Sequence, residues 1–449
     1  MKIIIAGAGE VGFHLAKLLS YESQDITLID TDKESLSYAD NHLDIRVLKG
    51  DATSVSVLQD ANVENSDLVI GVTASETTNL TLCFLAKQLG SKKTIARISN
   101  TEFVDNKELI KFDELGVDEL ISPEELAATE IQLLLNQSAF NDTYEFEEGL
   151  LTMVGVFLPK NAPFVGKMVK EAANIFPELH FMPIALQRMG TQYTVIPRGD
   201  TIFKEGDQLY FITSAEGVDE LYKLIGMKKK EIKNVMILGG SKVGCKTAHY
   251  LCNKRFNVKL FEKNKDKAFE IVDNLPNALV INGDGRNVEL LDEESIESMD
   301  AFIAVTGNSE TNIMSCLVAK SKGIKKTIAL VENMDYFQLS QSIGIDTLIN
   351  KKLLAANNIF RYIRRGEVLA LTRLINLNAE ILEFEVKPTS LVNGEIIKEL
   401  DFPRDAIIGG VIRNGKGIIA LGDFKILQGD KVVVCSLPKA ISKIEKLFL

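Results

Sequence analysis

IIIAGAGEVGFHLAKLLSYESQDITLID, residues 3–30, returns in altered form as VMILGGSKVGCKTAHYLCNKRFNVKLFE, residues 235–262. In both stretches a short apolar run leads into a glycine-rich turn, a helical pattern of apolar residues and a second apolar run that ends in an acid. Gly7 and Gly239, the first glycines, precede that acid by the same number of residues. This order of elements is typical of a dinucleotide-binding βαβ unit, in which backbone N–H groups at a helix N-terminus meet a pyrophosphate.

The first copy has the complete pattern of a Rossmann-like site. Gly7, Gly9 and Gly12 follow a predicted strand over 3–6. Asp30 ends the next predicted strand, where a carboxylate accepts a hydrogen bond from a ribose 2′-hydroxyl. A tight turn at a strand end would account for the glycines alone. It does not account for strand, glycines, helix, strand and acid in this order, so we interpret the stretch as a nucleotide site.

The second copy differs at one glycine. Ser241 stands where the middle glycine, Gly9, lets the backbone approach the pyrophosphate most closely. A Cβ at this point is expected to weaken or redirect the second nucleotide. Glu262 still ends the second strand, and an acid there disfavours a 2′-phosphate, so NAD(H) rather than NADP(H) is expected in both halves.

The similarity of the two halves continues beyond these stretches. LKGDATSVSVL at 48–58 matches INGDGRNVELL at 281–291, and β-rich runs alternate with helical spacing around both. This alternation predicts a parallel sheet covered by helices on both faces. Later in each half, IPRGDTIFKEGDQLYFI at 196–212 matches IALGDFKILQGDKVVVC at 419–435, and we interpret the Gly-Asp pairs as hairpin corners of a small α+β unit.

The predicted fold class is therefore α/β, with two doubly wound Rossmann-like domains that are each followed by a small α+β domain. A charged stretch, GMKKKEIKNV at 226–235, is interpreted as a solvated linker between the halves. The expected domains are residues 1–123, 140–226, 232–350 and 367–449.

Length and composition favour a folded protein of several domains. The chain has 449 residues, of which 46% are hydrophobic, a net charge of −11 and a sequence pI of about 5.2. The negative charge argues against binding to nucleic acid or docking on anionic lipid through a basic face. The apolar N-terminus stops at the glycine loop without a signal-peptide pattern, and no uncharged apolar stretch is long enough to span a bilayer. A cytoplasmic protein without direct membrane insertion is expected.

The five cysteines lack the spacing of a metal site. Cys83 and Cys316 lie at matching positions of the repeat, inside predicted apolar helices. We therefore expect buried free thiols.

The carboxyl ends of the parallel strands, where a doubly wound sheet binds ligands, direct attention to Asp51, Thr73 and Arg97. Asp51 is a candidate for contacting the adenine, Thr73 lies beside the expected pyrophosphate, and Arg97 has the planar fork that suits a phosphate. Asp284 and Thr306 repeat the first two. An Asx turn, a helix cap and an exposed salt bridge are the respective structural alternatives.

No set of residues suited to catalysis stands out. A hydride-transfer enzyme needs a proton donor and an anion clamp beside its cofactor. None of the histidines recurs at the equivalent position of the other half or stands beside a group of carboxylates; they are His14, His42, His180 and His249. Asn79 and Asn312 do recur, early in predicted helices, and are interpreted as bonding the local backbone.

Two differences in charge indicate that the halves are related but not equivalent. Lys351 and Lys352 replace Pro123 and Glu124 of the first half. RYIRRG at 361–366 is the one dense basic cluster in the second half, and we interpret it as an exposed basic helix end rather than as a phosphate contact at a subunit boundary.

Together, the order of modules, the GAGEVG and GGSKVG loops, the acids Asp30 and Glu262 and the paired Gly-Asp segments resemble the TrkA family. This family comprises the cytoplasmic regulatory subunits of bacterial and archaeal Trk potassium uptake systems. The resemblance covers essentially the whole chain, and few families place two nucleotide-binding and C-terminal regulatory (RCK) units in one chain. It implies a peripheral protein on the inner face of the cell membrane that binds a Trk-type potassium-conducting membrane subunit. It also implies a homo-oligomeric, tetrameric gating ring whose shape responds to NAD(H) and to ATP or ADP.

The resemblance also implies site residues. In the second half Ser241 departs from the glycine pattern and Leu330 replaces Arg97, which leaves binding of NAD(H) there open. The first site would consist of Gly7, Ala8, Gly9, Glu10, Val11, Asp30, Asp51, Thr73, Ala74 and Arg97. The second would consist of Gly239, Gly240, Ser241, Lys242, Val243, Glu262, Asp284 and Thr306.

Two other functions compete with this interpretation. An NAD-dependent dehydrogenase with a duplicated cofactor domain fits the glycine loops but lacks an acid and base set. A regulatory ring of another potassium channel or of an efflux antiporter fits the same domains. The two-unit chain favours a Trk system, because many other ring subunits carry one unit per polypeptide.

Overall fold

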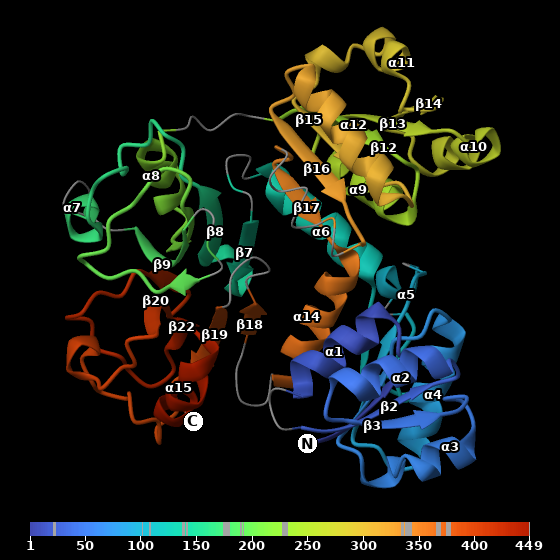
Figure 1. Cartoon of the computed structure of the whole chain (residues 1–449), viewed down its shortest axis with the longest axis horizontal. Coiled ribbons are helices and arrows are strands. Elements are labelled where there is room, and N and C mark those ends of the chain that lie inside the picture. The colour runs from blue at the N-terminus through green and yellow to red at the C-terminus, as the bar shows by residue number, and fades with distance from the viewer. Residues whose placement is uncertain are drawn as a thin grey trace. The chain divides into compact units, whose positions relative to one another are not determined.

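The computed structural model divides the chain into two compact units (Figure 1). One unit comprises Met1–Gln132 and Lys233–Tyr362, and the other comprises Leu133–Ile232 and Ile363–Leu449. The structure describes residues 1–449 except 21–23, 101, 107–108, 137–139, 141, 174–179, 189–190, 192, 227–231, 334–335, 337–343, 365–369, 374–378 and 449.

The first unit contains two parallel sheets of six strands with the same topology. In the first half the order is β3-β2-β1-β4-β5-β6, with β1 Lys2–Ala6, β2 Asp25–Asp30, β3 Arg46–Lys49, β4 Leu68–Gly71, β5 Lys93–Arg97 and β6 Glu119–Ile121. In the second half it is β14-β13-β12-β15-β16-β17, with β12 Asn234–Leu238, β13 Asn257–Glu262, β14 Leu279–Asn282, β15 Ala301–Ala304, β16 Lys326–Leu330 and β17 Thr347–Ile349. The strand order reverses between β1 and β4 and between β12 and β15, which is where doubly wound sheets bind ligands.

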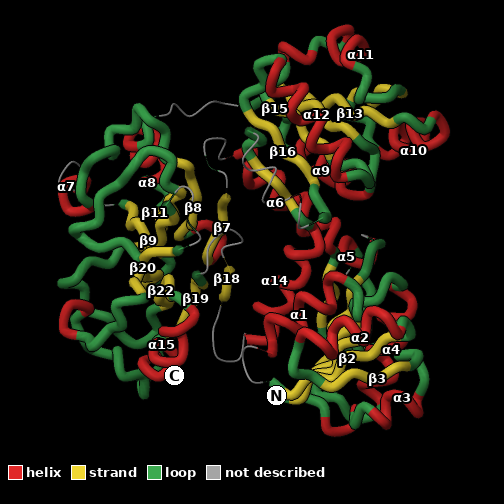
Figure 2. Tube along the Cα trace, viewed as in Figure 1, coloured by secondary structure: helices red, strands yellow, loops and turns green. Residues whose placement is uncertain are grey.

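Helices follow the strands in both halves, as the alternation in Figure 2 shows. The first half has α1 Glu10–Ser20, α2 Lys33–His42, α3 Val55–Asp60, the 3-10 turn Val63–Asn65, α4 Glu76–Gln88, α5 Glu102–Asp105 and α6 Pro123–Asn136. The second has α9 Lys242–Asn253, α10 Lys265–Asn274, α11 Val288–Glu293, the 3-10 turn Ile296–Ser298, α12 Ser309–Ser321 and α14 Lys351–Arg364. These sheets and helices confirm the predicted doubly wound class.

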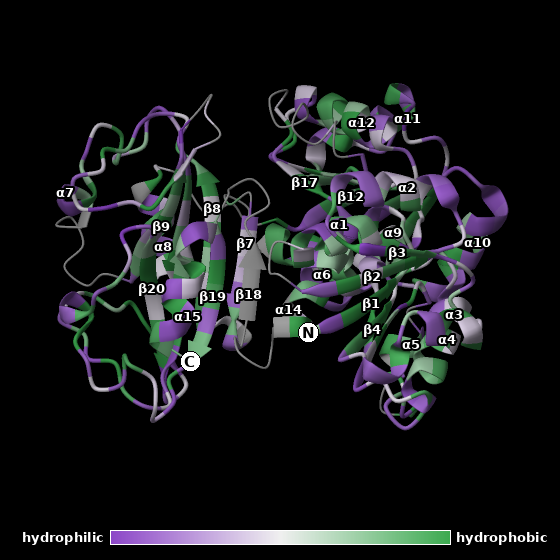
Figure 3. Cartoon of the chain, turned by 60° about the horizontal axis from the view of Figure 1, so that its bottom comes forward, coloured by the Kyte–Doolittle hydropathy of each residue, from purple (hydrophilic) through white to green (hydrophobic). Residues whose placement is uncertain are grey.

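The central strands are buried because helices cover them. Ile3, Ile4 and Ile5 of β1 are at most 2% exposed, which requires an apolar residue at every position rather than at alternate ones. Leu15 and Leu19, one helical turn apart on α1, are fully buried as well. Figure 3 shows the same pattern, with hydrophobic residues concentrated in the strands of the sheets.

The second unit contains two mainly antiparallel sheets of five strands. Their orders are β10-β9-β11-β8-β7 and β18-β19-β22-β20-β21. The strands are β7 Asp142–Phe146, β8 Leu151–Phe157, β9 Phe181–Gln187, β10 Thr194–Val195, β11 Gln208–Thr213, β18 Ala370–Arg373, β19 Glu380–Glu385, β20 Ala406–Arg413, β21 Lys416–Ile418 and β22 Lys431–Ser436. The helices are α7 Val169–Ala173, α8 Gly217–Leu224 and α15 Ile441–Phe448, with 3-10 turns at Glu147–Gly149, Ile397–Glu399 and Pro438–Ala440.

One hydrophobic core joins the two small modules. Met153, Ile184 and Tyr210 from the first module pack in the same buried cluster as Ile381 and Val433 from the second. Each module therefore buries part of its apolar surface only against the other.

The Gly-Asp pairs form turns, but the prediction that they are hairpin corners is wrong. Gly206 has a φ of +75° in a turn that precedes β11. β11 then pairs with β8 and β9 rather than with the segment on the other side of the turn. Asp207 is 1% exposed and its Oδ2 lies 2.7 Å from Nη1 of Arg188, so the acid fastens the turn to the sheet.

The cysteines are free, as expected, but not uniformly buried. Cys83, Cys316 and Cys435 are buried, and burial raises the pKa of the Cys83 thiol to about 12. Cys245 and Cys252 are half-buried, so the prediction of burial is wrong for these two. Among the described residues, no helix combines the length and hydropathy needed to cross a bilayer. Half of the linker predicted at 226–235 lies outside the described residues, and its last two residues, Asn234 and Val235, belong to β12 rather than to a linker.

Candidate nucleotide sites at the strand ends

The first glycine loop contains two glycines that the fold itself requires. Gly7 has a φ of +111°, and a Cβ there would lie 2.8 Å from the backbone nitrogen of Thr73. A Cβ on Gly12 would lie 1.8 Å from the Gly7 carbonyl oxygen. Gly9 differs from both, because within the described part of the chain nothing lies within 4 Å of a Cβ added to it. Packing therefore explains Gly7 and Gly12 and leaves Gly9 without a structural reason.

Asp30 holds this loop in place. Its Oδ2 accepts a hydrogen bond from the backbone N–H of Ala8 at 2.5 Å, and its Oδ1 accepts one from Asp32 at 2.9 Å. A carboxylate has about four acceptor positions, so this pattern leaves capacity for a ribose hydroxyl. The loop and the acid therefore belong to one arrangement at the ends of β1 and β2.

Thr73, at the end of β4, is fixed by a side chain of α4. Asn79 is fully buried, and its Oδ1 accepts hydrogen bonds from the backbone N–H and the hydroxyl of Thr73 at 2.9 and 2.7 Å. Its Nδ2 donates to the carbonyl oxygen of Arg97 at 2.9 Å. Asn79 thus bonds the local backbone at Thr73, as predicted, and beyond that prediction joins the ends of β4 and β5. Asn312 makes the same bonds to Thr306 and Leu330.

Arg97 ends β5 with an unused donor. Its Nε is buried and has no hydrogen-bond partner within the described part of the chain. A buried guanidinium nitrogen without a partner is costly, and a bound anion would satisfy it. Among the described residues Arg97 forms no salt bridge, and the phosphate contact stays a prediction.

Asp51 forms the Asx turn that was its structural alternative. Its Oδ1 accepts hydrogen bonds from the backbone N–H and the hydroxyl of Thr53, both at 2.8 Å. These bonds, the backbone one first, lower the pKa of the Asp51 carboxyl. The adenine contact stays a prediction.

The second loop repeats the required glycines. Gly239 has a φ of +108°, and a Cβ on Gly244 would lie 2.0 Å from the Gly239 carbonyl oxygen. Ser241, in the place of Gly9, turns its side chain into the protein. Its hydroxyl donates to the carbonyl oxygen of Val305 at 2.6 Å and accepts from the backbone N–H of Gly244 at 3.2 Å. Ser241 is therefore the N-cap of α9, and it occupies an N–H group that an anion would otherwise use.

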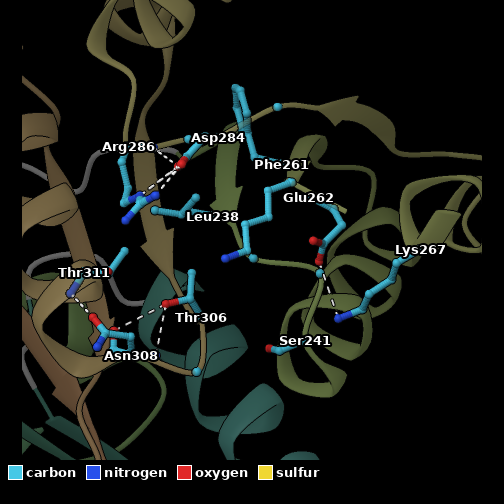
Figure 4. Close-up of a pocket in the computed structure, with 16 residues that line it drawn as sticks. Leu238, Ser241, Phe261, Glu262, Lys267, Asp284, Arg286, Thr306, Asn308 and Thr311 are labelled. Atoms are coloured by element: carbon cyan, nitrogen blue, oxygen red, sulfur yellow. Dashed lines mark hydrogen bonds and ion pairs between the residues drawn. The ribbon is translucent and has the colours of Figure 1, made fainter. Parts of the chain in front are cut away.

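A pocket of about 330 Å³ opens beside this loop (Figure 4). Such a volume lies at the lower end of the range for small-molecule sites. It is lined by Leu238, Gly239, Gly240, Ser241, Phe261, Glu262, Lys263, Lys267, Gly283, Asp284, Gly285, Arg286, Thr306, Gly307, Asn308 and Thr311. The predicted residues Lys242 and Val243 are not among them.

Ion pairs occupy the β13 and β14 side of the pocket (Figure 4). Nζ of Lys267 lies 3.4 Å from Oε2 of Glu262. Nη2 of Arg286 lies 2.5 Å from Oδ2 of Asp284, and hydrogen bonds from Arg286 lower the pKa of that carboxyl to about 2. Sequence reasoning missed Lys263, Lys267 and Arg286. Comparison of the two halves position by position would have found them, because each replaces a neutral residue.

Each glycine loop also contacts the other half of the first unit. Nζ of Lys352 lies 2.8 Å from Oε2 of Glu10 and 3.1 Å from Oε2 of Glu332. In the other direction, Lys242 donates to the carbonyl oxygen of Ser99 at 3.1 Å. Glu10 and Lys242 occupy the same position of the repeat, directly after the loop.

Lys351, the other lysine of the pair that replaces Pro123 and Glu124, also forms ion pairs at this contact. Nζ of Lys351 lies 3.5 Å from Oε1 of Glu124 and 3.0 Å from Oε1 of Glu332. The difference in charge between the halves thus forms part of the contact between them. Residues 361–364 of the basic cluster belong to the last turn of α14, and the rest of the cluster and its arginine side chains lie outside the described residues.

The described residues contain one pairing that the sequence did not indicate. Nδ1 of His180 lies 3.0 Å from Oε1 of Glu220 in the second unit, a single carboxylate rather than a group of them. No group of three or more potential metal ligands occurs among the described residues.

Comparisons with known proteins agree with this architecture. The family model described as TrkA-N domain matches residues 3–123 and 235–351, and that described as TrkA-C domain matches 153–226 and 381–449. The Trk system potassium uptake protein TrkA of Haemophilus influenzae is 34% identical over 100% of this chain and 98% of its own length. The TrkA homolog 1 of Methanosarcina mazei is 33% identical over 100% of both chains.

Two solved structures share the fold. The GsuK RCK domain matches with a TM-score of 0.62 and 16% identity, over 100% of this chain and 94% of its own. The GsuK channel bound to NAD matches with a TM-score of 0.61 and 17% identity, over 100% and 78%. Two TrkA-N and two TrkA-C domains in one chain, together with full-length relatives at this level of identity, show that the protein belongs to the TrkA family of Trk system potassium uptake proteins.

Proposed function

We propose that this chain is the cytoplasmic, nucleotide-sensing regulatory subunit of a Trk-type potassium uptake system. It binds peripherally to the potassium-conducting membrane subunit and assembles with further copies of itself into a tetrameric ring. NAD(H) at the first site, and ATP or ADP at either site, change the shape of that ring and thereby the flux of potassium. The names of the full-length relatives support the assignment to a Trk system.

The observation that carries the sensor proposal is the open position at Gly9. The fold requires Gly7 and Gly12, but no described protein atom lies within 4 Å of a Cβ on Gly9. A glycine at this position is explained if a pyrophosphate lies close to the backbone of the loop, because a side chain there would keep the two apart. The buried Nε of Arg97, which has no hydrogen-bond partner among the described residues, lies at the same edge of the sheet and supports an anionic ligand.

Regulation needs no catalytic group. A ligand that binds one ring conformation more tightly than another shifts their populations by its difference in affinity. A coupling free energy of about 1 to 3 kcal/mol changes the response of the partner site by roughly 5- to 150-fold. The GsuK channel, which has been solved with NAD and with ADP, shares this fold, and that likeness supports nucleotides as the ligands.

A variant of the open glycine tests the proposal. Gly9→Leu places a branched side chain in the space where the pyrophosphate would lie, and its Cβ meets no described protein atom within 4 Å. We expect NADH affinity, measured by isothermal titration calorimetry, to fall by at least about tenfold, which is about 1.4 kcal/mol. Potassium flux through the reconstituted membrane subunit should then lose its response to NADH.

Ser241→Leu is the matched variant, because Ser241 occupies the same position in the second loop. It should leave the NADH response of the first site in place. The proposal fails if Gly9→Leu abolishes NADH binding and potassium flux still responds to NADH. Turnover of NADH with 2-keto acids by the wild-type chain would instead support the dehydrogenase alternative.

A further inference from the structure

Three cations line the second pocket where the first half carries neutral residues. Lys263 directly follows β13, Lys267 lies in the first turn of α10 and Arg286 follows β14. Their counterparts in the first half are Thr31, Ser35 and Thr53. None of the first-half counterparts of the other lining residues is a lysine or arginine. The difference is therefore a change of charge at one edge of an otherwise repeated site.

The position of these cations identifies the part of a nucleotide that they would contact. A doubly wound domain binds the adenosine ribose at the end of its second strand. It binds the pyrophosphate at the glycine loop that follows its first strand. In this domain the end of β13 is therefore the ribose side, and Lys263 and Lys267 lie there. Arg286 follows β14, the strand end assigned above to the adenine, and also lines a hollow beside Thr311 of α12.

The acid at the end of β13 no longer presents an unpaired charge. Oε1 of Glu262 accepts the backbone N–H of Asn264 at 2.9 Å, and Oε2 lies 3.4 Å from Nζ of Lys267. Asp30, its counterpart, accepts hydrogen bonds from two backbone N–H groups and forms no ion pair with a lysine among the described residues. Asp30 therefore repels a phosphate on the ribose in the first half, whereas Lys267 offsets that repulsion by Glu262 in the second.

The opposite side of the second site also lacks the arginine of the first, while Lys242 stands in place of Glu10 directly after the loop. Arg97, at the end of β5, is replaced by the buried Leu330 at the end of β16. The hydroxyl of Ser241 already occupies the N–H of Gly244 at the start of α9. The second site thus offers less to a pyrophosphate and more to an anion at the ribose than the first.

We propose that the second pocket selects a nucleotide with a phosphate monoester on its adenosine ribose, as NADP(H) has at the 2′ position. A monoester carries close to two charges at neutral pH, so three cations against the two carboxylates of the pocket favour it over an unmodified ribose. This inference rests on the proposed function, in which the glycine loops bind nucleotides. It reverses the expectation of NAD(H) in the second half and keeps it in the first.

The test uses the full-length chain with the first site blocked by Gly9→Leu. In this background we expect NADPH to bind at least about tenfold more tightly than NADH in calorimetric titrations at moderate salt, because charge-assisted hydrogen bonds distinguish the two ligands. Lys263→Thr together with Lys267→Ser restores the first-half residues and should remove the preference. Arg286→Thr, tested separately, should reduce it.

Lys265→Thr is the control, because Lys265 lies on α10 between the two lysines in sequence but does not line the pocket. It should keep the preference for NADPH, and thermal unfolding should show that all variants are folded. The inference is overturned if the blocked chain binds both ligands equally, binds neither, or keeps its preference after the double substitution.

Ser241→Leu separates this failure from that of the sensor proposal. If this variant binds NADH at its intact first site and the Gly9→Leu chain shows no preference for NADPH, only the inference about the second pocket is wrong. If Ser241→Leu binds no NADH, the proposal that the loops sense nucleotides is itself wrong.

Discussion

Gly9 and Ser241 show how one residue changes what a glycine loop offers to a ligand. The loops share their required glycines and their strand and helix geometry. At Gly9 the loop is open, whereas the hydroxyl of Ser241 bonds the carbonyl oxygen of Val305 and the N–H of Gly244. In the second loop the hydroxyl of Ser241 therefore accepts a hydrogen bond from the start of the helix, as a bound anion would do in the first loop.

Replacing Ser241 by glycine should expose the N–H groups at the start of α9. Glycine is itself an acceptable N-cap, so the free energy of unfolding should fall by only about a few tenths of a kcal/mol. The affinity of the second site for nucleotides should rise, because the N–H of Gly244 becomes available. Titration of NADPH into Ser241→Gly in the Gly9→Leu background measures this, and an unchanged or weaker affinity would contradict the role given to the hydroxyl.

At the scale of elements, the ends of β4 and β5 depend on a buried side chain of α4. Asn79 bonds Thr73 through both atoms of its amide and also holds the carbonyl oxygen of Arg97. A Cβ on Gly71 would lie 3.0 Å from Cα of Asn79, so α4 sits directly on β4. The helix therefore positions the ends of two strands at the candidate nucleotide site.

Asn79→Ala should destabilise the chain and weaken the first site together. Removing the amide leaves buried backbone groups without partners, and we expect the free energy of unfolding to fall by about 2 to 4 kcal/mol in urea titrations. NADH affinity should fall as well, since Thr73 and Arg97 lose their support. Asn41→Ala, at an exposed position on α2, should change stability by less than about 0.5 kcal/mol. Unchanged stability in Asn79→Ala would show that the amide does not support the strand ends.

The elements themselves were predictable from the sequence to an unequal degree. The strands that lead into Gly7 and Gly239 were predictable, because an apolar run, a glycine turn and a helical period all indicate the same structure. The turn before β11 was misread as a hairpin because strand pairing depends on segments distant in sequence, here β8 and β9. The orientation of the Ser241 hydroxyl could not be predicted either, because its partner Val305 follows a different strand.

At the scale of the whole molecule, charged groups gather where the two small modules meet. Nζ of Lys431 in the second module lies 2.6 Å from Oε2 of Glu147 in the first. Glu383, on β19, is 2% exposed, and within the described part of the chain its Oε1 has no hydrogen-bond partner. Burial first, and then the charge of Glu147, raise the pKa of the Glu383 carboxyl to about 7.

This raised pKa predicts a pH dependence of stability. A carboxyl whose pKa is higher in the folded than in the unfolded state stabilises the fold below its ordinary value, and that contribution is lost as pH rises through about 7. Glu383→Gln should therefore raise the melting temperature at pH 8 and change it little at pH 5. Glu385→Gln, exposed on the same strand, should lack this difference. Equal effects of Glu383→Gln at both pH values would show that Glu383 does not titrate in this range.

The core shared by the two small modules has a consequence for how such a chain evolves. Ile184 and Tyr210 of one module pack with Ile381 and Val433 of the other, so each half of the sequence is an incomplete folding unit. The polypeptide has the internal organisation of a dimer whose subunits have been joined end to end. A true homodimer must change both copies of a residue at once, whereas a joined one changes a single copy. Ser241 and the three pocket cations lie in one half only, which is the asymmetry that such a fusion permits.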